Sequence, residues 1–107
     1  MKRFKCVVTR EDEYIIEFDE SRFNEEKMAK FRSHFYKFHS YEEHAEHIAQ
    51  FRSRFPDNSF IEGYGIPLVN GKVSYIPGSY SVDDIEEGIN IQVISEDESC
   101  DVEVTEI

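Results

Sequence analysis

The chain of 107 residues contains no tryptophan, 2 cysteines and 3 prolines, and no apolar run approaches the roughly 18 residues of a membrane span. Its start, MKRFKCVVTRED, has basic residues but no long apolar stretch after them, so we expect neither a signal peptide nor membrane binding. A cytoplasmic location is therefore predicted. Cys6 and Cys100 would then be reduced and buried as small apolar side chains, with a disulfide as the alternative if their strands are neighbours.

Catalytic signatures are missing as well. The chain has no GxSxG nucleophile turn, no P-loop and no GxGxxG dinucleotide loop. The 23 acidic residues allow so many carboxylate pairs that no single pair stands out as an acid–base couple. The sequence predicts no catalytic residue and no cofactor, and it favours a non-enzymatic protein.

Positive charge is absent from the last third of the chain. Residues 1–72 hold all 12 Lys and Arg against 13 acids, which gives −1, whereas residues 73–107 hold 10 acids and no cation, which gives −10. An acidic surface repels nucleic acid and lipid headgroups and attracts basic proteins. We therefore expect no direct binding of nucleic acid by this part of the chain.

Aromatic residues are abundant, with 9 Phe and 6 Tyr, and each ring can bury a large apolar area. A disordered chain would lack them. The length suits one domain with a modest core. We therefore predict a single folded domain that spans residues 1–107.

Alternating polarity predicts strands at residues 3–9, 13–19, 89–95 and 100–107, and residues 60–69 resemble an irregular strand with glycine bends. The first two would form a hairpin, and the last two a closing hairpin. The pair Asn70-Gly71 is a type I′ turn signal between two short strands. In the first and closing hairpins, the residues expected to face the core include Phe4, Cys6, Val8, Cys100, Val102 and Val104.

Two helices lie between these strands. Asn24 is a candidate N-cap for a helix that carries Met28, Phe31, Phe35 and Phe38 on one face. Ser40 begins a second helix with a capping box to Glu43, and Pro56 ends this helix at Phe55. The order β-β-α-α-β-β-β-β predicts an α+β fold, an antiparallel β-sheet with two helices packed on one face.

Four histidines lie within a short stretch, at His34, His39, His44 and His47. His44 and His47 share a helix flank, and Glu43 is four residues before His47, a spacing that can chelate a metal. A zinc site needs three or four converging ligands, and EEHAEH is not the HExxH arrangement. The sequence favours a polar helix surface here, with a small metalloprotein as an alternative.

Two other features have both a binding and a structural interpretation. Gly63 and Gly65 flank Tyr64, which predicts either a β-bulge at a sheet corner or a binding loop that presents the tyrosine. The first helix carries the basic residues Lys27, Lys30, Arg32 and Lys37 beside Tyr36. Neighbouring acids weaken this patch as a nucleic-acid surface.

Several segments together resemble a family of small phage- and prophage-encoded proteins of unknown function. They are YIIEFDESRFNEEKMAKFRSHF, a second helix, an EGYG segment and the closing pair GINIQVI and DVEVTEI. The chain lacks the Trp that this family carries in its helix. The resemblance implies a phage or mobile-element context and the β-α-α-β order, and it assigns no functional residue.

The leading hypothesis is a small acidic binding protein that docks on a basic protein partner through its C-terminal half, in its narrowest form as a DNA mimic or anti-defence inhibitor. The acidic turn DDIEEG lacks the carboxylate spacing of a calcium loop. A structural or homo-oligomerising module, including a homodimer, is the alternative. The candidate partner-binding residues are Asp83, Asp84, Glu86, Glu87, Glu96, Asp97, Glu98, Asp101 and Glu103.

Overall fold

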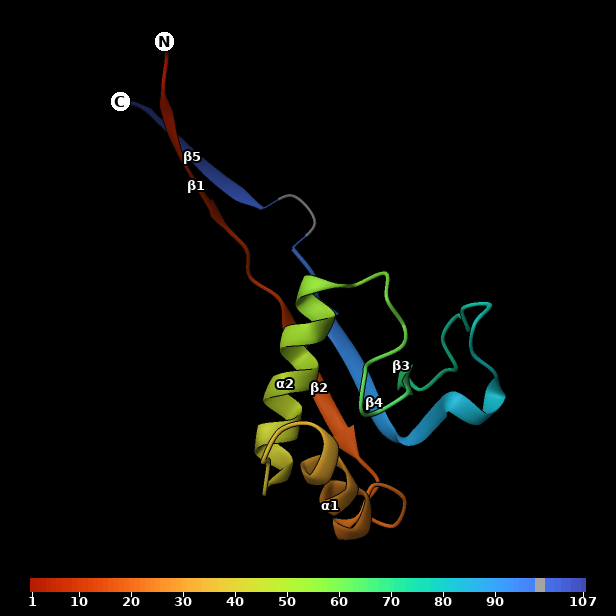
Figure 1. Cartoon of the computed structure of the whole chain (residues 1–107). Coiled ribbons are helices and arrows are strands. Elements are labelled where there is room, and N and C mark those ends of the chain that lie inside the picture. Colours follow the sequence, from red (N-terminus) through yellow and green to blue (C-terminus); the bar gives the residue numbers. More distant parts are fainter. Residues whose placement is uncertain (98–99) are drawn as a thin grey trace.

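The computed structural model describes residues 1–97 and 100–107. It confirms the predicted α+β class, with both helices on one face of the central strands (Figure 1). The elements are β1 (Phe4–Thr9), β2 (Glu13–Phe18), α1 (Glu25–His34), α2 (Tyr41–Arg54), β3 (Ile66–Val69), a 3-10 turn η1 (Val82–Asp84), β4 (Ile85–Ser95) and β5 (Asp101–Glu106). No helix in the described part of the chain is long and apolar enough to span a bilayer.

The strand pairing differs from the two predicted hairpins. β1 pairs with β5 and β2 pairs with β4, both antiparallel, while β3 adds to β4 in parallel. The reason lies in residues 10–12, which offer no Gly or Asn for a tight reversal. The chain therefore runs on from β1 into β2, and β4 runs on into β5 beside them. One predicted sheet becomes two sheets along one long ribbon.

This ribbon gives the molecule a body and a projecting arm (Figure 1). We call β1 and β5 the arm; the body contains the other elements. The principal extents are 56 × 28 × 26 Å, and the radius of gyration is 17.0 Å. A compact chain of this length would have a radius of about 13 Å. The arm accounts for the excess, because both of its strands lie beyond the end of α2.

Both predicted N-caps are confirmed. The Asn24 side chain accepts a hydrogen bond from the Lys27 amide at 3.1 Å, and Ser40 accepts one from the Glu43 amide at 3.2 Å. Helix α1 ends at His34, earlier than predicted. Phe38 instead turns back to stack on Phe31, with ring centroids 5.6 Å apart. Aromatic packing therefore overrides the helical spacing of that stripe.

The core lies between the helices and the β2–β4 pair. Its buried residues are Phe23, Met28, Phe31, Ile48, Ile61, Tyr64, Ile89 and Ile91. Burial of each large side chain contributes about 1.5–3 kcal/mol. Phe35 and Phe55, both assigned to helix stripes from the sequence, are exposed because each falls just past the end of its helix.

The two glycine-containing turns have different outcomes. Asn70 and Gly71 adopt the positive φ angles of 53° and 75° that the turn prediction requires, but the chain after Lys72 is irregular and forms no strand. The EGYG segment is a tight turn closed by a bridge between Ile61 and Gly65, and it is not a bulge. It buries Tyr64, which therefore cannot act as a presented binding residue.

Candidate functional site: the arm and its base

The arm has one apolar face and one polar face. Residues directly opposite in an antiparallel pair share a face, and Cys6 lies opposite Val104 while Val8 lies opposite Val102. The apolar face, so defined, carries Phe4, Cys6, Val8, Val102 and Val104, with Glu106 opposite Phe4. The polar face carries Lys5, Val7, Thr9, Asp101, Glu103 and Thr105.

Both faces of the arm are open to solvent. Phe4 is 53% exposed, Val8 63% and Val104 61%. The prediction that these residues face the core is therefore wrong, because the helices cover only the β2–β4 part of the ribbon (Figure 1). An isolated two-stranded ribbon is marginally stable in water. The arm must be stabilised at its base, by a cover, or by both.

A polar network fixes the base of the arm to the body. The Asp12 carboxylate accepts hydrogen bonds from Arg10 Nε at 2.7 Å, Ser53 Oγ at 2.5 Å and the Asp97 amide at 2.9 Å. The hydrogen bond from Arg10 is the largest cause that holds the pKa of Asp12 well below its usual range. Asp12 thereby joins both chain segments at the base to helix α2.

A second part of this network is centred on Glu96. Its carboxylate accepts hydrogen bonds from Tyr14 Oη at 2.8 Å and from Arg52 Nη2 at 3.0 Å. Burial would raise the pKa of Glu96, but the bonds from Arg52 and Tyr14 lower it overall. Burial and the bond to Glu96 raise the pKa of Tyr14 to about 12. Nothing in the sequence periodicity identified Asp12, Tyr14 or Arg52 as a unit.

Five of the nine predicted partner-binding acids already make contacts within the protein. Glu86 pairs with Lys27, and Glu87 pairs with Arg22, each at 2.9 Å. Asp84 accepts a hydrogen bond from the Ser81 amide in a capping box. Asp97 accepts one from the Cys100 amide at 2.9 Å, and Glu96 belongs to the base network. These five side chains are therefore engaged within the fold.

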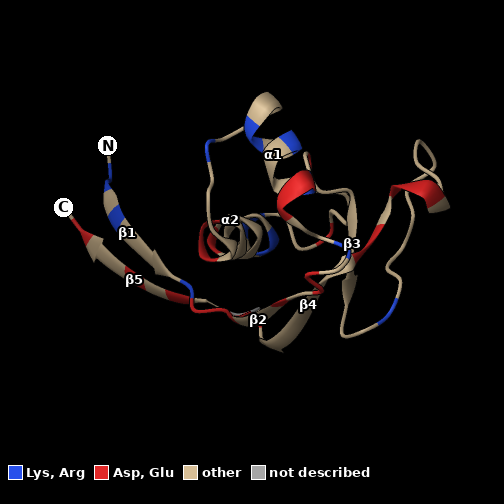
Figure 2. Cartoon of the chain, turned by 90° about the horizontal axis from the view of Figure 1, so that it is seen from below, with Lys and Arg blue, Asp and Glu red and all other residues tan. Residues whose placement is uncertain are grey.

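The remaining acids divide between the arm and η1. Asp101 and Glu103 are exposed on the polar face of the arm, and Asp83 is exposed in η1. Within the described part of the chain, none of these three forms an ion pair. Glu98 lies outside the described residues. Figure 2 shows that the acidic positions spread along the length of the ribbon and do not gather in one cluster.

Opposite charges lie on the two strands of the arm. Lys5 lies in β1, with Lys2 and Arg3 just before it, whereas Asp101, Glu103 and Glu106 lie in β5 (Figure 2). The described residues of the arm form no ion pair with one another. The arm therefore presents a basic strand beside an acidic one.

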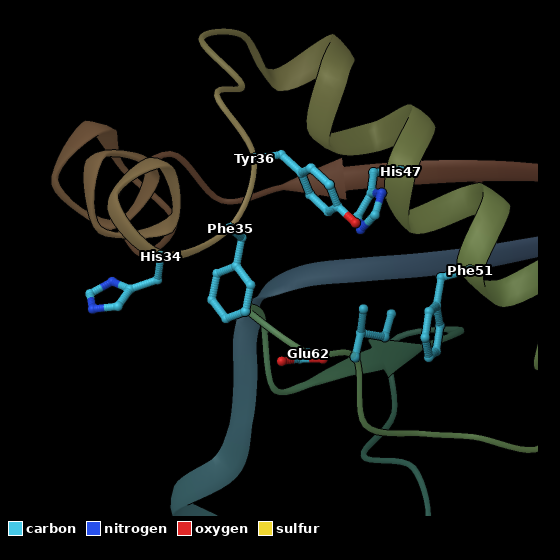
Figure 3. A pocket seen from close by; sticks show the side chains of 7 residues that line it. His34, Phe35, Tyr36, His47, Phe51 and Glu62 are labelled. Carbon is cyan, nitrogen blue, oxygen red and sulfur yellow. The ribbon is translucent and has the colours of Figure 1, made fainter.

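An aromatic pocket of about 450 Å³ lies on the body (Figure 3). Its lining comprises His34, Phe35, Tyr36, His47, Phe51, Ile61 and Glu62. The Tyr36 and His47 rings are 5.2 Å apart on one wall, and burial lowers the pKa of His47. Aromatic walls suit an apolar guest. In the part of the chain that the structure describes, no three His, Cys, Asp or Glu side chains converge as metal ligands.

His44 differs most from the polar helix surface predicted for the histidines. It is completely buried, with its ring among Phe23, Phe31 and Phe38. Its Nδ1 shares a hydrogen bond of 2.7 Å with Tyr64 Oη. Burial lowers the pKa of His44 and raises that of Tyr64. The pair is a neutral hydrogen-bonded contact inside an aromatic core.

The cysteines and the basic helix also have defined places. Cys6 and Cys100 are free thiols, and Cys6 is exposed on the arm, so its predicted burial is wrong. Two of the four basic helix residues are paired with acids, Lys27 with Glu86 and Arg32 with Glu25. This pairing reduces the positive charge that the first helix could offer to nucleic acid.

Comparison with known proteins adds no relative: no family model, no curated protein and no solved structure matches this chain.

Proposed function

We propose that this chain is a non-enzymatic binding protein that docks on a basic protein partner through its acidic C-terminal half. The observation that carries the proposal is the charge of −10 over residues 73–107, from 10 acids and no cation. Such a field attracts a basic surface and speeds encounter with it. A phage or mobile-element setting, as the sequence resemblance implies, would make a basic host protein the expected partner.

The carboxylates best suited to this role are Asp101 and Glu103. Both are exposed on the polar face of the arm, and neither is engaged in an ion pair within the described chain. Alternate positions of one strand lie about 7 Å apart. A paired strand therefore holds these charges in a fixed array, which costs less ordering entropy on binding than a disordered acidic tail.

The test measures binding to a purified basic partner, first captured from host lysate, as a function of salt. Affinity should fall steeply between low and high ionic strength. The double variant Asp101→Lys with Glu103→Lys should lose most of the binding. The matched control is Glu42→Lys with Glu46→Lys on α2, which changes the net charge equally on exposed residues away from the arm.

Equal loss in both double variants would show that only net charge matters, and unchanged binding in the arm variant would refute the proposal. Competition with duplex DNA tests the narrower hypothesis, that the protein is a DNA mimic. A DNA mimic should be displaced from its partner by duplex DNA, because both occupy the same cleft. If the partner binds this protein and duplex DNA at the same time, the protein docks on a basic partner but does not mimic DNA.

A further inference from the structure

The aromatic pocket on the body is assembled from three segments of the chain. Helix α1 ends just before Phe35, so Phe35 and Tyr36 leave the helix and are 42% and 56% exposed. Helix α2 contributes His47 and Phe51 from one flank, since they are four residues apart. The EGYG turn adds Glu62 (Figure 3). Exposed aromatic rings gathered at one pocket are typical of an interaction site.

The pocket combines aromatic ring faces with one negative charge. Glu62 is exposed, and within the described part of the chain it forms no ion pair. Among the described residues, no Lys or Arg lines the pocket. The face of an aromatic ring is negative and attracts a cation within about 6 Å of the ring centre. We propose that this pocket binds an organic cation with a methylated ammonium head, with Glu62 as its counter-charge.

The two histidines of the pocket do not oppose this charge. Burial lowers the pKa of His47 below its ordinary 6.5, so its ring is neutral at neutral pH. The His34 ring is turned away from the other lining side chains, and its Nδ1 lies 3.1 Å from the Lys30 carbonyl oxygen (Figure 3). Lys27 and Lys30 line the neighbouring groove instead, and Lys27 is paired there with Glu86.

The apolar lining determines which kind of cation fits. An unmodified ammonium is strongly hydrated and needs hydrogen-bond acceptors that Phe51 and Ile61 do not offer. A metal ion needs several converging ligands, and the described residues contain no such group. A methylated ammonium has an apolar surface over its positive charge, so it leaves water readily and contacts the ring faces. The pocket volume of about 450 Å³ lies within the roughly 300–1,000 Å³ typical of small-ligand sites.

NMR titration with choline tests the requirement for charge. Choline carries a trimethylammonium head, and 3,3-dimethylbutan-1-ol has the same shape with carbon in place of the charged nitrogen. Choline should produce saturable shifts in the ring resonances of Phe35, Tyr36 and Phe51. The neutral alcohol should bind about tenfold more weakly, because it keeps the apolar contact and loses the attraction between the cation and the rings.

Two conservative variants locate the site. Glu62→Gln keeps the size of the side chain and removes the counter-charge, whereas Tyr36→Leu keeps an apolar side chain and removes the ring. Each should weaken choline binding by about threefold to tenfold. The matched controls are Glu42→Gln and Tyr75→Leu, on exposed residues outside the pocket, and both should bind choline like wild type.

A peptide titration identifies what carries the ammonium head. A trimethyllysine peptide that binds about tenfold more tightly than choline would assign the head to a methylated protein side chain. Similar or weaker binding of the peptide would assign it to a free small molecule. This inference is independent of the proposed docking on a basic partner, because Asp101 and Glu103 lie on the arm. The double variant Asp101→Lys with Glu103→Lys should therefore bind choline like wild type.

Three results would overturn the inference. The first is the absence of saturable shifts with choline up to about 50 mM. The second is a neutral alcohol that binds as tightly as choline, which would make the pocket a plain apolar site. The third is wild-type affinity for choline in both Glu62→Gln and Tyr36→Leu, which would place the bound cation elsewhere on the protein.

Discussion

The carboxylate of Asp12 accepts a hydrogen bond of 2.9 Å from the backbone amide of Asp97, although 85 residues separate the two positions. In the other direction, the carboxylate of Asp97 accepts a longer hydrogen bond of 3.4 Å from the backbone amide of Glu11. The two strands of the ribbon are thus tied together at the place where their regular pairing stops. We therefore expect this pair of hydrogen bonds to hold the arm in its direction.

Replacement of Asp12 with Asn should loosen the arm before it affects the body. Asparagine keeps the size of the side chain but loses the negative charge of the carboxylate. Arg10 and Ser53 both donate hydrogen bonds to that carboxylate. The check is amide hydrogen exchange, in which protection at Val7 and Glu103, which lie opposite each other in the arm, should fall while protection at Ile91 in β4 persists. Equal loss of protection in arm and body would contradict a local role.

The same carboxylate predicts a dependence on pH. Its pKa in the folded protein lies below the ordinary 3.8, chiefly through the hydrogen bond from Arg10. Its contribution to stability is therefore complete above about pH 4 and is lost as the pH falls further. Arm protection factors should decline in acid in wild type, and they should change less in Asp12→Asn.

Glu96 should matter for stability far more than an exposed acid of the same region. Glu96→Ala leaves the half-buried Arg52 without its carboxylate and should cost about 1–3 kcal/mol. Glu103→Ala on the open arm should stay within about 0.5 kcal/mol of wild type. Urea denaturation gives both values, and similar losses would argue against the base network.

Gly65 and Gly71 both have positive φ, and substitution at each of them distinguishes the cost of backbone strain from that of a steric clash. A Cβ on Gly65 would lie 2.4 Å from the Asp84 carbonyl oxygen, whereas a Cβ on Gly71 would meet nothing within 4 Å. Gly71→Ala should cost roughly 1–2 kcal/mol from the left-handed conformation alone. Gly65→Ala should cost more than that, measured by thermal unfolding, and an equal cost would mean that the turn shifts freely.

The buried His44 predicts a loss of stability in mild acid. Burial lowers its pKa in the folded protein below the ordinary 6.5, so the unfolded chain binds the proton more readily. The contribution is complete above about pH 6.5 and declines as the pH falls toward the folded pKa. The decline should flatten in His44→Phe and persist in the exposed control His39→Gln, both followed by urea denaturation at several pH values.

The sequence predicted the local structure well, because caps and turns depend on neighbouring residues. Asn24, Ser40 and the Asn70-Gly71 turn each behave as their types require. Strand alternation also predicted which residues share a face of the arm. It did not predict that the face is uncovered, since alternation says nothing about what lies opposite.

The site was harder to foresee than the fold for a related reason. Glu86 and Asp101 look alike in a run of acids, yet Glu86 meets Lys27 while Asp101 meets no cation among the described residues. Partners that lie 59 residues away, as Lys27 does, leave no local signal. The burial of His44 could not be predicted for the same reason, because it depends on Tyr64 and the aromatic rings around it, which lie elsewhere in the sequence.

The pairing of β1 with β5 has a consequence for synthesis of the protein. β1 leaves the ribosome well before its partner strand, which follows more than 90 residues later, since Thr9 pairs with Asp101. At 5–20 residues per second this delay is roughly 5–20 s. During that time the apolar side chains of β1 have no strand beside them. The β1 segments of neighbouring nascent chains on one polysome are therefore exposed to contact with each other before they can pair with β5.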